Sequence, residues 1–308
     1  MTDLAAAGPG TAPFSGGEIV AALDALEHAA RACSLATSRW RDAATALDDP
    51  QARAVAVATA ERSLARSDEL LALLALLADV GASSGRPTLT VGAVLGRAAG
   101  GVASRYPSMV VRERSEIATQ RRTLAPAQAA ALTVAVCGAL GNAARHGPPD
   151  ATVSVRATTR GRALSVIVTS PGGLPGKPLI PGRGITSARE LVEDAGGTYR
   201  VQDVAAGVVV DVTVPLAARW PTPLPKSRLA AGPKGAASGV LARTVLRIQG
   251  THGMAAPLRE AQWLVPGHVS ECLRTSLDRL EQTAAELAAV LPSDAPLAPL
   301  WPTSASLR

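Results

Sequence analysis

Aromatic residues are scarce in this 308-residue chain: they make up 2% of it, although apolar residues make up 47%. The hydrophobic core must therefore be built largely from Ala, Val and Leu, and the chain is long enough to bury a sizeable one. Lysine is also scarce and occurs only at positions 177, 226 and 234, so arginine supplies most of the positive charge behind the net charge of +6. Because no aromatic side chains are interleaved with the arginines, a nucleic-acid surface is not expected. The positive charge would still attract an anionic ligand or an acidic partner.

Cysteine pairs and membrane signals are missing as well. The three cysteines, at positions 33, 137 and 272, lie far apart without metal-ligand spacing, so neither a disulfide framework nor a zinc site is expected. The first ten residues carry an acid where a signal peptide carries a base. The longest apolar run, residues 70–80, is interrupted by Asp79 and is too short to span a bilayer. We expect a cytoplasmic protein without a membrane span.

Two common catalytic motifs are absent too: the sequence has no Walker-type loop and no His-Glu-x-x-His. Composition and periodicity divide the chain into five predicted segments. These are a disordered N-terminus (1–16), a helical hairpin (17–84), an α/β domain (85–216), a Pro-, Gly- and basic-rich linker (217–250) and a C-terminal helical segment with a tail (251–308).

The hairpin segment contains two amphipathic helices. Apolar residues recur at steps of three and four in the first helix, at Ile19, Leu23, Leu26, Ala30 and Cys33. Such a hairpin buries its apolar stripe best against a second copy, which predicts a homodimer. The last helix, expected at about residues 267–291, carries leucines at heptad spacing and either docks on the hairpin or binds a partner protein.

The α/β segment alternates helical and strand patterns. A helix is expected at 126–146, with its proline in the first turn. Strands follow at about 152–157 and 164–169, then a loop, a helix at 185–195 ended by two glycines, and strands at 198–202 and 208–214. The fold class predicted for the whole chain is α+β: an N-terminal helical hairpin, an α/β two-layer sandwich and a C-terminal helix.

Polar residues on the helix at 126–146 suggest a phosphate-binding site. Gly138, Asn142 and His146 are spaced four apart and share one face. The amide oxygen of Asn142 can bind Mg²⁺, while Arg145 and His146 can donate hydrogen bonds to phosphate oxygens. The alternative is that Asn142 and His146 merely face solvent, with His146 favouring the helix C-terminus.

A second anion-binding element is Gly182-Arg-Gly184 at the start of the next helix. Glycines there let backbone N–H groups approach an anion, and the helix N-terminus adds positive potential. A flexible loop end explains the same residues without any ligand.

The α/β segment contains, in order, the motif Asn142-Ala-Ala-Arg145-His146, the strand pair, the Gly/Pro loop closed by Gly182-Arg-Gly184, and the last helix and strands. This order resembles the ATP-binding domain of two-component sensor histidine kinases, which belong to the GHKL or Bergerat-fold ATPase superfamily. The resemblance covers roughly residues 89–216. It implies ATP and Mg²⁺ as ligands, with Asn142 as the Mg²⁺–phosphate ligand and Arg145 and His146 near the phosphates.

The chain departs from this family at two acidic positions. Gly138 stands where the family usually carries Glu, and losing a general base typically costs ~10²–10⁴-fold in rate. Ser170-Pro171-Gly172 corresponds to the family's Asp-x-Gly, whose carboxylate binds the adenine amino group. Losing that charge-assisted contact costs ~1–2 kcal/mol. Nucleotide binding can survive both changes, whereas phosphoryl transfer is less assured.

His28 is the candidate phosphoacceptor, because it is the only histidine of the hairpin and lies off the apolar stripe. In the family the acceptor is followed by an acid, whereas here Glu27 precedes it, and an ordinary solvated residue is the alternative. The leading hypothesis is a kinase that transfers the γ-phosphate of ATP to a histidine and serves a response regulator or other signalling protein. The rivals are a pseudokinase acting as a docking module and an anti-sigma-type serine kinase, against which the long hairpin argues.

Overall fold

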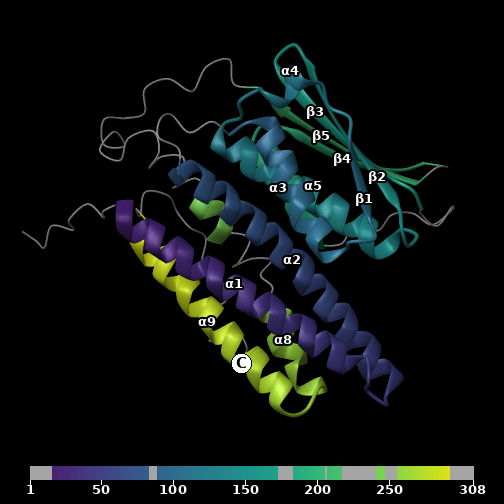
Figure 1. The fold of residues 1–308 in the computed structure, drawn as a ribbon, viewed down its shortest axis with the longest axis vertical. Coiled ribbons are helices and arrows are strands. Elements are labelled where there is room, and N and C mark those ends of the chain that lie inside the picture. Colours follow the sequence, from purple (N-terminus) through teal and green to yellow (C-terminus); the bar gives the residue numbers. More distant parts are fainter. Residues whose placement is uncertain are drawn as a thin grey trace, which may run out of the picture.

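A helical bundle and an α/β sandwich lie side by side in the computed structural model of the chain (Figure 1), which describes residues 16–82, 89–172, 183–204, 207–216, 241–246 and 255–291. The predicted disordered N-terminus lies outside the described residues, apart from Gly16. The expected α+β class, with a helical hairpin, a two-layer sandwich and a C-terminal helix, is confirmed.

The sandwich contains a five-stranded sheet in the order β1-β2-β3-β5-β4. Its strands are β1 (Val110–Glu113), β2 (Thr152–Arg160), β3 (Ala163–Ser170), β4 (Thr198–Val204) and β5 (Gly207–Pro215). Only the β1–β2 pair is parallel among these strands. Side chains alternate between the two faces, so that Val153 and Val155 of β2 are buried beneath the helices while Ser154 and Arg156 point away from them.

Three helices cover one face of this sheet: α3 (Val91–Arg105), α5 (Pro126–His146) and α6 (Arg183–Asp194). A short helix, α4 (Ile117–Gln120), connects β1 to α5 and was not predicted. The alanine-rich sequence of α5 favours a helix, and the side chain of Gln128 accepts a hydrogen bond from the N–H of Ala125 at its start. By length and composition α5 could cross a membrane, but 78% of its apolar window is buried inside the fold, as expected of a core helix.

The bundle consists of α1 (Gly16–Ala44), α2 (Pro50–Ala82), α8 (Ala255–Ala261) and α9 (His268–Val290). Helix α9 runs along α1, and α8 packs against α2 (Figure 1). The predicted stripe of α1 is buried at Leu26, Ala30 and Cys33. Of the two roles predicted for the last helix, docking on the hairpin is therefore the one observed, and α9 covers a stripe that the sequence assigned to a second copy of the chain.

Residues 241–246 differ from the sequence-based expectation. They fall inside the segment predicted as a linker, yet they are helical, and Leu241, Ala242, Val245 and Leu246 are buried. Their apolar residues are spaced four apart, which is a helical pattern too short to stand out beside the Pro- and Gly-rich residues before it.

Helix α3 depends on a side-chain cap at its start. The hydroxyl of Thr90, whose backbone is extended, accepts a hydrogen bond from the N–H of Ala93 at 3.2 Å. We expect Thr90→Ala to lower the free energy of unfolding by about 0.5–2 kcal/mol, because the freed N–H loses its partner. Denaturant unfolding checks this, with Thr275→Ala as the control, since the exposed Thr275 hydroxyl only donates to a carbonyl within its own helix. Equal losses in both variants would contradict the capping role.

Candidate functional site

The C-terminal half of α5 holds the residues that the sequence assigned to the phosphates. The guanidinium of Arg145 donates from Nη2 to Oδ1 of Asn142 at 2.7 Å and from Nε to the carbonyl oxygen of Gly141 at 3.0 Å. Both side chains are half-buried. The amide oxygen assigned to Mg²⁺ therefore already accepts a hydrogen bond from a cation, and Arg145 would have to turn away before a metal ion could replace it.

His146 is at the end of the same helix and is exposed. Partial desolvation and the neighbouring Arg145 lower the pKa of its imidazole below 6.5. The ring is thus mostly neutral at pH 7, and it would donate to a phosphate through a single N–H.

The turn at the end of β3 lies against this end of α5. Ser170 is buried, and its hydroxyl donates to the carbonyl oxygen of Val208 at 3.5 Å. Gly172 has φ +94°, which disfavours other residues, and a Cβ there would lie 3.0 Å from Cδ of Pro148. The structure therefore brings Ser170 and Gly172 next to the residues that follow His146. Gly182 lies outside the described residues.

Gly138, which stands where the family carries Glu, is next to a carboxylate from another helix. A Cβ at Gly138 would lie 3.4 Å from Oε1 of Glu69, a residue of α2. Glu69 is almost fully buried, and this burial raises the pKa of its carboxyl despite the favourable charges of Arg66 and Arg145. Motifs and spacing do not select Glu69, although an acid within the most apolar part of a helix is a signal of a buried polar contact.

Arg66 continues this contact to α6. Its Nη1 lies 2.5 Å from Oε2 of Glu69, and its Nη2 would lie 3.2 Å from a Cβ at Gly184. The side chains of Arg66 and Glu69 are 13% and 4% exposed. The ion pair thus extends from Gly138 on α5 to Gly184 at the start of α6. These two glycines mark the region that the sequence predicted for a triphosphate.

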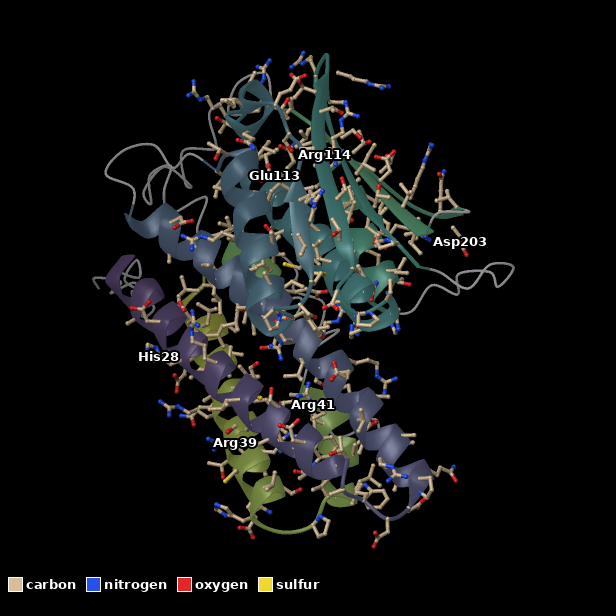
Figure 2. All side chains as sticks on the ribbon, turned by 45° about the vertical axis from the view of Figure 1, so that its right-hand side comes forward. His28, Arg39, Arg41, Glu113, Arg114 and Asp203 are labelled. Carbon is tan, nitrogen blue, oxygen red and sulfur yellow. The ribbon has the colours of Figure 1, made fainter. Side chains whose placement is uncertain are left out.

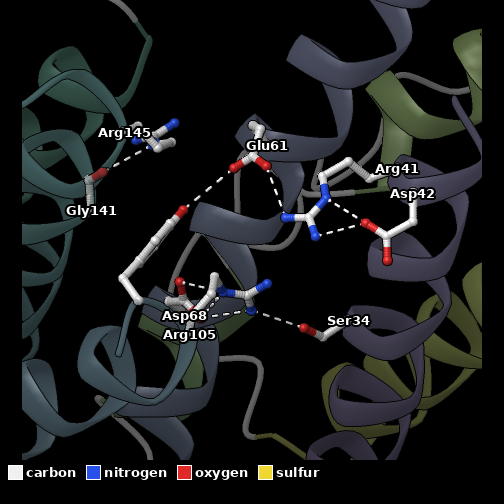
Figure 3. A network of polar contacts seen from close by, with 9 residues as sticks. Ser34, Arg41, Asp42, Glu61, Asp68, Arg105, Gly141 and Arg145 are labelled. Atoms are coloured by element: carbon white, nitrogen blue, oxygen red, sulfur yellow. Dashed lines mark hydrogen bonds and ion pairs between the residues drawn. The ribbon is translucent and has the colours of Figure 1, made fainter. Parts of the chain in front are cut away.

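A second polar network joins α2 to α1 and α3 (Figure 3). The guanidinium of Arg105 donates to both carboxylate oxygens of Asp68 at 2.7–2.9 Å and to the hydroxyl of Ser34 at 2.9 Å. Burial outweighs this pairing and raises the pKa of Asp68. Glu61 accepts from Arg41 at 3.0 Å. The network holds the hairpin against α3, one of the helices that cover the sheet.

His28 lies apart from these residues. It is exposed on α1, on the side that faces away from the sheet (Figure 2), and its Nδ1 donates to the carbonyl oxygen of Asp24 at 2.8 Å. Helix α2 packs against both α1 and α5. Transfer of a phosphoryl group from α5 to His28 would therefore require the hairpin to move relative to the sandwich.

Two surface hollows lie elsewhere on the sheet. One, of about 370 Å³, is on the face that carries no helices and is lined by Arg114, Ser154, Arg156, Ile167 and Thr169. The other, of about 340 Å³, is lined by Arg160, Arg162, Ala163, Gly196, Gly197, Thr198, Thr213 and Pro215. Neither hollow includes a residue predicted for the nucleotide, and the described residues next to Gly138 and Gly184 are Glu69 and Arg66.

The groups near Gly138 and Gly184 nevertheless fit an anion, because they already hold the Glu69 carboxylate. Arg66 contacts this carboxylate directly, and the positive charge of Arg145 stabilises it at longer range. Within the described residues, no group of three or more His, Cys, Asp or Glu could hold a metal ion. A Mg²⁺ ion at Asn142 would thus take most of its ligands from phosphate oxygens and water, as Mg²⁺ bound with nucleotides commonly does.

No protein-family model and no curated protein matches the chain. Among solved structures, it is similar to the histidine kinase domain of a blue-light activated histidine kinase from Erythrobacter litoralis, with 20% identity and a TM-score of 0.42 over 61% of this chain and 94% of that one. It is also similar to the mycobacterial sensor histidine kinase MprB, with 23% identity and a TM-score of 0.34 over 40% of this chain and 91% of that one.

The catalytic domain of the histidine kinase ThkA is a third similar structure, with 14% identity and a TM-score of 0.36 over 41% of this chain and 94% of that one. At such low identities and TM-scores, the similarity says nothing about activity.

Proposed function

We propose that this protein is a cytoplasmic signalling protein that binds Mg-ATP between α5 and α6 in the manner of a histidine kinase. The observation that supports this most is the set of groups around the Glu69 carboxylate. Arg66 contacts a buried anion beside Gly138, one helical turn from Asn142, Arg145 adds positive charge to it, and the start of α6 lies next to the Arg66 guanidinium. Guanidinium groups and a helix N-terminus are the donors that phosphate groups need.

If the reaction takes place, the γ-phosphate is transferred to His28 and then to a response regulator. The residues supply charge neutralisation and positioning: Arg66 and Arg145 balance phosphate charge, and Asn142 orients the metal-bound phosphates. Mg²⁺, when bound, would neutralise further charge on the phosphate oxygens. The predicted homodimer remains part of this proposal, and it would need a face of the hairpin that α9 leaves open.

The rival function is a pseudokinase that uses the same fold for docking. The absence of an acid on α5 at Gly138 and the separation of His28 from α5 by α2 favour it. Incubation with γ-labelled ATP distinguishes the two. Acid-labile label that disappears in His28→Gln supports the kinase, and the absence of label in a chain that binds ATP supports the pseudokinase. Label that is stable to acid would instead indicate the serine kinase.

Nucleotide binding itself is tested at Asn142. We expect Asn142→Ala to weaken Mg-ATP binding by about tenfold or more, because a ligand of the metal and phosphates is lost. Calorimetric titrations with and without Mg²⁺ measure this, and the loss should be confined to the Mg²⁺-containing titration. Gln202→Ala is the control, since it removes an exposed amide from β4. A wild-type chain that binds no nucleotide at millimolar concentration would contradict the proposal.

A further inference from the structure

The ion pair between Arg66 and Glu69 occupies the region that the proposed function assigns to the phosphates. Oε1 of Glu69 is next to Gly138, and Nη2 of Arg66 is next to Gly184. The two side chains come from α2 and are joined at 2.5 Å. The hairpin therefore reaches into the sandwich with one carboxylate and one guanidinium, and Figure 1 shows α2 running alongside the helical layer that covers the sheet.

A glycine lies at each end of this contact, next to one of the two charged side chains. A side chain on Gly138 would meet the Glu69 carboxylate, and a side chain on Gly184 would meet the Arg66 guanidinium. Neither glycine has a positive φ, because both lie within α-helices, where glycine is destabilising by roughly 0.5–1 kcal/mol relative to alanine. Backbone conformation therefore does not require glycine at these positions, and the two glycines place the backbones of α5 and α6 close to Glu69 and Arg66.

Glu69 is in an unfavourable position for a carboxylate. Its side chain is almost fully removed from water, and the transfer of an ion to such a place costs several kcal/mol unless a partner offsets it. The charges that offset it are those of Arg66, by direct contact, and of Arg145, at longer range, whereas Asp68 on the same helix opposes it. A phosphate group in the same place would be stabilised by the same two cations.

We propose that Glu69 competes with the nucleotide for Arg66, so that Arg66 is a phosphate-binding residue which Glu69 occupies until nucleotide arrives. This inference rests on the proposed function, because it assigns a further residue to the same site. When a phosphate replaces the carboxylate on Arg66, Glu69 loses its partner and α2 loses one contact with α5 and α6. Nucleotide binding is thereby coupled to the position of the hairpin that carries His28, and the coupling is reciprocal.

The competition is tested with Glu69→Gln in the full chain. This variant keeps the shape of the side chain and an oxygen that can accept from Arg66, but it removes the charge, so the fold should persist with reduced stability, which a thermal melt verifies. We expect affinity for Mg-ATP and for inorganic triphosphate to rise by about tenfold, because the internal anion no longer competes. Affinity for adenosine, which carries no phosphate, should not change.

Two further variants make the result specific. Glu281→Gln removes a carboxylate from a matched pair with Arg259, between α8 and α9, and should leave the affinities unchanged. Arg66→Gln combined with Glu69→Gln leaves no buried charge unpaired, so it should fold, yet it should bind triphosphate at least tenfold more weakly than Glu69→Gln alone. That loss identifies Arg66 as a phosphate ligand and not only as an anchor of the hairpin.

The outcomes separate this inference from the proposed function. If the wild type and all variants bind neither nucleotide nor triphosphate, the proposed function itself fails. If the wild type binds Mg-ATP and Glu69→Gln binds it with equal affinity, only the competition is wrong, and the ion pair merely holds α2 against the sandwich. Equal binding by Glu69→Gln and the double variant would likewise overturn the role of Arg66.

Discussion

Replacing Trp40 with alanine is expected to lower the free energy of unfolding by about 3–5 kcal/mol, which is a large part of the stability of a typical domain. Trp40 is fully buried in α1, and its ring packs within the bundle. Its Nε1–H also donates to the hydroxyl of Ser270 on α9 at 3.2 Å. The substitution therefore removes both a large buried surface and a hydrogen bond between the first and last helices of the bundle.

Denaturant unfolding followed by far-ultraviolet circular dichroism measures this loss without depending on tryptophan emission. Trp263→Ala is the matched control, because that side chain is 74% exposed and should contribute less than about 0.5 kcal/mol. Similar losses in the two variants would show that Trp40 is not at the centre of an intrachain bundle.

Trp40 also illustrates what the sequence predicts about this bundle and what it does not. The three- and four-residue spacing from Leu26 to Cys33 predicts the helix and its buried side, and both are confirmed. The same spacing cannot name the partner, because any apolar helix satisfies it. The pattern favoured a second copy of the chain, and it also allowed the last helix to dock on the hairpin. The structure selects α9, which lies in the same chain and so pays no entropy for association between chains.

The sandwich was more predictable than the site. The helix expected at 126–146 and the strands and helix expected after it are present in the predicted order. The Arg66–Glu69 pair was missed because it joins residues of α2 to Gly138 and Gly184, which are far away in the sequence. Periodicity identifies the face of a helix, whereas a contact between two glycines and a charged pair depends on how whole elements pack.

Replacing Asp68 with alanine is expected to lower the free energy of unfolding by about 3–5 kcal/mol, because it leaves the guanidinium of Arg105 without its partner. The side chains of Arg105 and Asp68 are 15% and 7% exposed. The hydroxyl of Ser34 is the other group to which Arg105 donates, and a single neutral acceptor does not balance a buried charge. The loss should appear as weakened packing of α3 on the hairpin, seen as faster hydrogen exchange in both elements.

An exposed ion pair provides the control. Arg97 and Asp79 are 49% and 41% exposed, so Asp79→Ala should cost only about 0–1 kcal/mol.

The double variant Asp68→Leu with Arg105→Met, which replaces the buried pair by apolar side chains of similar size, should be about as stable as the wild type. Such recovery would show that the cost of Asp68→Ala comes from the unpaired charge of Arg105, and a double variant as unstable as Asp68→Ala would contradict that cause. Asp68 and Glu69 are adjacent on α2, so the Asp68–Arg105 pair also holds the hairpin where Glu69 contacts Arg66 and Gly138. Asp68→Ala should therefore raise nucleotide affinity, as Glu69→Gln is expected to do.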